Sequence, residues 1–154
     1  MRPVRLAVAA CLALSMSTAC QTGPSVTAGR QYTCCQGHDP EVPYRSGDTV
    51  TLRWTVRTFG TPSGPPETEL TARLTGPYQD TAALKATADA RTITGDVTVT
   101  AEPVRPTGAP GEEPTSVLRI GTDVPAGHYN LVWSARDSRG GLSGASVVEV
   151  VAAP

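Results

Sequence analysis

Apolar and polar residues alternate strictly along several stretches of the chain. In residues 49–58 the apolar residues Val50, Leu52, Trp54 and Val56 alternate with threonine or arginine. Residues 70–74 and 129–135 repeat the same two-residue period. Because successive side chains of a strand point to opposite faces of a sheet, this period predicts three strands with one buried and one solvated face.

Shorter apolar segments between turn sequences predict further strands. We expect strands at residues 117–120 and 146–151, and a hairpin formed by residues 91–94 and 97–101. Residues 81–88 are rich in alanine, which also suits a helical turn, but strands flank them and we interpret them as a weak strand. The 14 prolines and 15 glycines interrupt the chain too often for a long helix. The pattern predicts an all-β fold, a single antiparallel β-sandwich.

Proline, glycine and acidic residues concentrate in residues 103–114, which we interpret as a flexible loop. The segments on either side of this loop are too short to form two separate domains. We therefore expect one sandwich domain at residues 32–154. Residues 20–31 lack any periodicity and are interpreted as a flexible tether.

The first 19 residues have the three parts of a secretory signal peptide. Residues 1–5 carry two arginines and no acid, residues 6–16 are apolar, and residues 17–19 are Ser, Thr and Ala. The apolar segment is shorter than the ~20 residues of a membrane-spanning helix. The sequence therefore predicts export, with residues 1–19 removed.

Small residues directly before Cys20 resemble the lipobox of bacterial lipoproteins. The resemblance implies that the thiol of Cys20 is acylated, palmitate being among the expected chains, and anchors the protein to the extracytoplasmic face of the membrane. Ser17 departs from the aliphatic residue that this family prefers. The alternative is cleavage by an ordinary signal peptidase and secretion without a lipid.

The pattern Asp123-x-x-x-Gly127-x-Tyr129, followed by an alternating strand and a valine-rich last strand, resembles the closing hairpin of bacterial Ig-like and fibronectin-III-like domains. The resemblance implies a tyrosine corner, in which the hydroxyl of Tyr129 bonds to backbone a few residues upstream. Trp54 and Trp133 share the inward parity of their strands, and we expect both to pack between the sheets.

Cys34 and Cys35 are the residues most open to chemical interpretation. Once Cys11 and Cys20 are assigned to the signal peptide and the anchor, they form an even pair in an oxidising compartment. Adjacent strand residues point to opposite faces, so a disulfide between them needs a turn. The pair has three interpretations: a vicinal disulfide, two free or intermolecularly paired thiols, or a Cu or Zn site shared with His38 and Asp39.

Three arginines, Arg53, Arg57 and Arg73, are expected on one outward face of two strands. Such a face can bind an anionic ligand such as a cell-wall polymer. The more ordinary interpretation is a solvated face, balanced by neighbouring acidic residues such as Glu67 and Glu69.

Composition and the absence of known motifs reduce the number of functions that we expect for this protein. Without the two signal-peptide arginines, 11 basic residues face 14 acidic ones, a net charge of −3 and no basic stripe for nucleic acid. The sequence holds none of the serine-elbow, zinc-protease or phosphate-loop motifs. We therefore expect a non-enzymatic, cofactor-free cell-envelope lipoprotein, an Ig-like module that binds an envelope protein or polymer. The alternative is an envelope redox or metal-handling protein acting through Cys34, Cys35 and His38.

Overall fold

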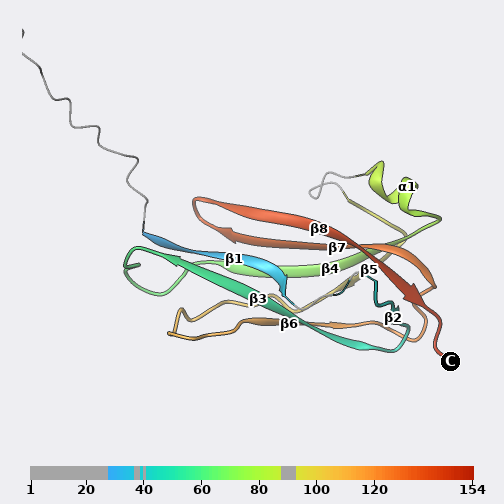
Figure 1. The fold of residues 1–154 in the computed structure, drawn as a ribbon, viewed down its shortest axis with the longest axis horizontal. Helices are drawn as coiled ribbons and strands as arrows, with labels where there is room; N and C mark the ends of the chain where they lie inside the picture. Colours follow the sequence, from blue (N-terminus) through green and yellow to red (C-terminus); the bar gives the residue numbers. More distant parts are fainter. Residues whose placement is uncertain (1–27, 37–38, 40, 88–92) are drawn as a thin grey trace, which may run out of the picture.

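The protein folds as two β-sheets packed face to face, with one short helix outside them (Figure 1). The computed structural model describes residues 28–36, 39, 41–87 and 93–154, so the predicted signal peptide and Cys20 lie outside the described residues. The elements are, in chain order, β1 (Gly29–Gln36), β2 (Tyr44–Arg45), β3 (Thr49–Phe59), β4 (Glu69–Tyr78), α1 (Thr81–Lys85), β5 (Val97–Thr100), β6 (Thr115–Arg119), β7 (Gly127–Asp137) and β8 (Gly140–Val151).

The two sheets differ in size. The smaller has the strand order β1–β3–β6 and the larger the order β2–β8–β7–β4–β5. Every strand pair is antiparallel except the short β2–β8 contact, which is parallel. The β7–β8 hairpin has the longest register, from Gly127 opposite Val150 to Asp137 opposite Gly140. The all-β sandwich predicted from the alternating pattern is confirmed.

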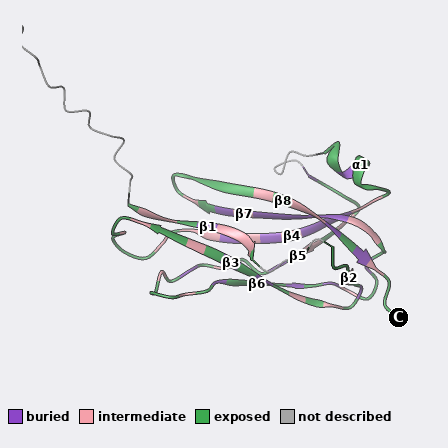
Figure 2. Ribbon diagram, in the orientation of Figure 1, coloured by how far each residue is buried: buried purple, intermediate pink, exposed green. Residues whose placement is uncertain are grey.

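The core lies between the sheets, where the inward residues of both meet. Trp54 of β3 and Trp133 of β7 are 2% and 9% exposed, and their rings meet edge to face with centroids 6.0 Å apart. The indole N–H of Trp54 donates to Oγ of Ser116 over 3.0 Å, so burial leaves this polar atom paired. Figure 2 shows β7 buried along most of its length, whereas the first half of β8 is exposed.

Two local predictions are wrong. Residues 81–88 are not a strand in their described part, because Thr81–Lys85 form α1. The side chain of Asp80 caps this helix by accepting the N–H of Ala83 over 2.7 Å, and Leu84 is its buried residue. The predicted hairpin at residues 91–101 is also absent from the described residues, since β5 pairs with β4 instead.

The sandwich begins earlier than predicted. β1 starts at Gly29, opposite Phe59 of β3, so the last residues of the predicted tether belong to the smaller sheet. Residues 103–114 form a loop as expected, although Val104 bridges to Leu70 through two backbone hydrogen bonds. In the described part of the chain, no helix has the length and apolar character needed to cross a bilayer.

Candidate functional site

Two depressions adjoin at the end of the sandwich where β1 begins. One, of about 300 Å³, lies between β1 and the β7–β8 turn and is lined by Arg30, Tyr32, Asp137 and Arg139 among others. The other, of about 310 Å³, follows residues 62–68 and is again lined by Arg30, Asp137 and Arg139. Because they share these residues, we call them together the end groove. The groove offers both charged and apolar surface to a ligand.

Arg30 positions the loops that border the end groove. Its two terminal nitrogens donate to the carbonyl oxygens of Gly64 and Gly108, each over 3.2 Å. Gly108 has a φ of 77°, and a Cβ there would lie 2.7 Å from Cδ of Pro66, so glycine allows the two loops to approach. Arg30 is thus largely engaged by backbone, whereas the side chain of Arg139 is 73% exposed and accessible to a ligand.

The β7–β8 turn holds its charges in fixed positions. The carboxylate of Asp137 accepts the backbone N–H groups of Arg139 and Gly140 over 2.8 and 3.1 Å, and it pairs with the Arg139 guanidinium over 3.2 Å. The backbone N–H of Arg139 contributes most to lowering the pKa of Asp137 below its ordinary value. The carboxyl group of Asp137 is therefore ionised at neutral pH, and it orders the turn and orients Arg139 at the groove.

Tyr32 lies at the inner side of the end groove. Its side chain is 2% exposed, and burial raises the pKa of its hydroxyl. Among the described residues this hydroxyl has no hydrogen-bond partner. Tyr32 therefore contributes a neutral aromatic wall to the groove over the physiological pH range.

Cys34 and Cys35 lie at the end of β1, where the pairing with β3 is irregular. Cys34 is opposite Trp54 and Gln36 is opposite Arg53, so Cys35 is the extra residue of a β-bulge. Both cysteines are partly buried and pack against the core, and their sulfur atoms are in contact. The bulge thus lets two adjacent residues face the same side of β1, which regular alternation forbids. Whether the two sulfurs form a covalent bond in the native protein stays a prediction.

The structure adds no support to the metal interpretation. Within the described residues, no three histidine, cysteine or acidic side chains lie close enough together to hold a metal ion. His38 lies outside the described residues, and Asp39 is exposed.

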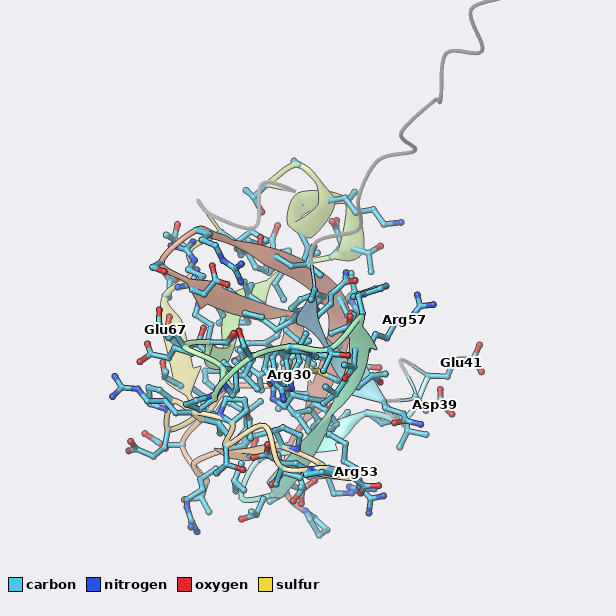
Figure 3. The ribbon with its side chains drawn as sticks, turned by 90° about the vertical axis from the view of Figure 1, so that its left-hand side faces the viewer. Arg30, Asp39, Glu41, Arg53, Arg57 and Glu67 are labelled. Atoms are coloured by element: carbon cyan, nitrogen blue, oxygen red, sulfur yellow. A yellow bond between two sulfur atoms is a disulfide. The ribbon has the colours of Figure 1, made fainter. Side chains whose placement is uncertain are left out.

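The prediction that Arg53, Arg57 and Arg73 share one face is wrong. Arg53 and Arg57 are exposed on β3 of the smaller sheet, whereas Arg73 lies on β4 of the larger sheet. Figure 3, which looks at the β1 end of the molecule, shows Arg53 and Arg57 pointing away from the sandwich and Arg30 between its layers. Arg57 also lies over the ring of its neighbour Phe59, with its guanidinium carbon 6.0 Å from the ring centroid. Alternation predicts the direction of a side chain but not which sheet its strand joins.

Tyr129 has the contact that the resemblance implies. Its ring is fully buried, and its hydroxyl donates to the carbonyl oxygen of Pro125, four residues upstream, over 2.8 Å. This bond ties the turn before β7 to the core and is structural in character.

Sequence reasoning missed the residues of the end groove. Arg30 falls within residues 20–31, which are predicted as a tether. Arg139 falls within the Asp137-x-x-Gly140 pattern, which is typical of a turn and gives no signal for a ligand site. A scan against known protein families finds no match, and neither does a search of curated proteins.

Proposed function

We propose that this protein is a non-enzymatic lipoprotein of the bacterial cell envelope, an Ig-like module that binds an envelope protein or polymer at the end groove. The observation that carries the proposal is the groove itself, which Arg139, held by Asp137, borders with an exposed guanidinium and which the buried Tyr32 closes on its inner side. An accessible arginine held in a fixed position is typical of binding interfaces, where arginine contributes much of the affinity.

The groove is tested by binding measurements with matched arginine variants. The probes are isolated insoluble cell wall, used in co-sedimentation, and detergent-solubilised envelope proteins, immobilised on a sensor surface. We expect Arg139→Ala to weaken binding at least about fivefold, as truncation of an arginine at the centre of an interface does. Arg119→Ala is the control, because it removes the same charge from an exposed position of β6 at the opposite end of the molecule. Equal losses for both variants would exclude the groove as the binding site.

The predicted anchor at Cys20 is tested by the mass of the protein purified from its own membranes. Acylation at Cys20 and removal of residues 1–19 give a mass of residues 20–154 plus the acyl groups. Cys20→Ser is expected to release the protein from the membrane fraction into the medium or periplasm. An unacylated mass, with the wild type already in the soluble fraction, would support secretion without a lipid.

A second candidate function is redox chemistry at Cys34 and Cys35. It is favoured by the contact between the two sulfurs in an edge strand, where a partner protein can reach them. A vicinal disulfide gains two hydrogens on reduction, which raises the intact mass by about 2 Da. If Cys34→Ala/Cys35→Ala keeps wild-type binding and loses only stability, the redox candidate is excluded. If the double variant stays folded and loses the function, the binding proposal fails.

A further inference from the structure

A row of three hydroxyl groups crosses the outer face of the larger sheet. Thr71 of β4 is directly opposite Ser134 of β7, and Ser134 is directly opposite Ser143 of β8. The oxygens of Thr71 and Ser134 are 2.8 Å apart. Because residues opposite each other in a sheet share a face, the three side chains form one polar strip across three adjacent strands.

Two arginines flank this strip from opposite directions. Arg73 follows Thr71 by two residues on β4, and Arg136 follows Ser134 by two residues on the antiparallel β7. Two residues of a strand advance about 7 Å, which the side chain of arginine can span. Both arginines and all three hydroxyl residues line one depression of about 100 Å³. The larger sheet therefore brings five side chains that carry hydrogen-bond donors to one small depression.

The backbone around the depression keeps the arginines in position. Gly141 lies opposite Arg136, and a Cβ at Gly141 would be 2.7 Å from both Cγ of Arg136 and the carbonyl oxygen of Ala135. The missing side chain thus leaves the space that the stem of Arg136 occupies. One terminal nitrogen of Arg73 donates to the carbonyl oxygen of Ile93 over 3.2 Å, which uses one of its five N–H donors.

The charge of the depression is not neutralised by its surroundings. Glu69 is opposite Arg136 in the register, but its carboxylate accepts two bonds from Arg105 over 2.8 and 3.2 Å. Within the described part of the chain, Arg136 forms no ion pair of its own. The depression thus has two arginines and hydroxyl groups, while the nearby carboxylate of Glu69 is paired with Arg105. Such a set of side chains is suited to binding an anion.

We propose that Arg73, Arg136 and the hydroxyls of Thr71, Ser134 and Ser143 bind a phosphate group. The guanidinium fork matches the oxygens of phosphate. The hydroxyl hydrogens that the Thr71–Ser134 bond leaves free donate to the remaining oxygens. The depression of about 100 Å³ is open to solvent and has room for one phosphate group. The phosphate can belong to free phosphate, to a phosphodiester of an envelope polymer or to a lipid headgroup. This site is separate from the end groove and does not depend on the function proposed for that groove.

The experiment titrates the full-length Cys20→Ser variant with three probes, so that vesicles cannot bind it through the proposed lipid anchor. The probes are inorganic phosphate, soluble poly(glycerol phosphate) and vesicles of anionic phospholipid. Saturable binding of inorganic phosphate with Kd up to about 10 mM is expected, as for a small ligand at an open site. At equal phosphate concentration, a polymer source is indicated by at least tenfold tighter binding of the polymer, and a lipid source by the same preference for vesicles. Absence of saturable binding of all three probes would overturn the proposal.

Matched double variants separate a built site from general charge attraction. Arg73→Gln/Arg136→Gln is expected to weaken phosphate binding at least tenfold. Arg53→Gln/Arg57→Gln removes the same two charges from the smaller sheet and should change binding less than twofold. Equal weakening by both pairs would overturn the proposal, since it would show that net charge alone attracts the ligand. The thermal midpoint of each variant verifies folding.

Two further variants test the geometry with the arginines intact. Gly141→Ala places a methyl group against Cγ of Arg136 and the carbonyl oxygen of Ala135, so it should shift Arg136 and weaken binding severalfold without any change of charge. Ser134→Ala removes the central hydroxyl and should weaken phosphate binding by a smaller factor. If neither variant alters the Kd while both stay folded, the phosphate does not bind at this strip.

Discussion

At the scale of single residues, the buried tyrosines Tyr129 and Tyr32 differ in their hydrogen bonding, because only the hydroxyl of Tyr129 has a partner among the described residues. The hydroxyl of Tyr129 donates to the carbonyl of Pro125, and loss of such a bond costs about 1 kcal/mol. Tyr129→Phe should therefore lower the free energy of unfolding by about 1 kcal/mol, measured by urea denaturation at neutral pH. A variant as stable as the wild type would mean that the corner contributes nothing to the fold.

Tyr32→Phe is the matched substitution at a hydroxyl that has no partner among the described residues. Burial of an unpaired hydroxyl is unfavourable, so its removal should leave the stability unchanged or raise it by up to about 1 kcal/mol. The same urea titration compares the two variants. A loss for Tyr32→Phe equal to that of Tyr129→Phe would show that the Tyr32 hydroxyl is hydrogen-bonded in solution.

At the scale of elements, the 103–114 loop is held by one carboxylate. Glu112 accepts the backbone N–H groups of Thr107 and Gly108 over 2.8 and 2.7 Å. The bond from Thr107 is the main reason why the pKa of Glu112 lies below its ordinary value of 4.5. Burial, the next largest effect, raises this pKa, and the bond from Gly108 lowers it further. The charged form of Glu112 therefore orders this loop.

The sign of the pH dependence follows from the lowered pKa. Because the folded pKa is below the unfolded one, the stabilisation is fully present above pH 4.5 and is lost as the pH falls through the folded pKa. We expect hydrogen exchange at Thr107 and Gly108, corrected for the intrinsic rate, to accelerate in this acidic range. In Glu112→Gln this acceleration should disappear. An unchanged profile in the variant would mean that another group controls the loop.

The elements that the sequence predicts best are those with one clean period. β3 alternates without interruption because one of its faces lies in the core and the other outside it. β7 alternates in sequence except at Val132, although residues 129–133 are all buried. β1 escaped prediction because it is an edge strand with one fully buried residue and a bulge at Cys35 that breaks the period. α1 was mistaken for a strand although Asp80 is a good N-cap, because five residues are too few to establish a helical period.

The candidate sites were harder to predict, for a related physical reason. Ser134 and Ser143 belong to one hairpin, so the length of its turn determines that they meet. Thr71 and Arg73 join them only because β4 pairs with β7, about 60 residues further along the chain. Which strands become neighbours depends on the packing of the whole sandwich. The alternating pattern therefore identified outward arginines and assigned Arg73 to the wrong partners.

At the scale of the whole molecule, the start of β1 and the C-terminus lie at opposite ends of the sandwich (Figure 1). The end groove is at the β1 end, since Arg30 lines it. Eight residues separate Cys20 from Gly29, and a fully extended chain spans at most ~3.3–3.6 Å per residue, or about 30 Å over this segment. An anchor at Cys20, as proposed, therefore keeps the end groove near the membrane and directs the C-terminal end outward.

This arrangement is tested with a fluorophore placed at either end of the anchored protein. Ser63→Cys labels the loop that borders the end groove, and Thr122→Cys labels an exposed turn at the far end. In vesicles that carry a quencher on the lipid headgroup, the Ser63 label should be quenched at least twice as strongly as the Thr122 label. The control is Cys20→Ser in each labelled protein, which should abolish quenching because the domain no longer stays at the surface. Equal quenching at both ends would mean that the sandwich lies flat on the bilayer, with the groove and the sheet faces at the same height. Stronger quenching at Thr122 would place the groove outward and contradict a short anchor at Cys20.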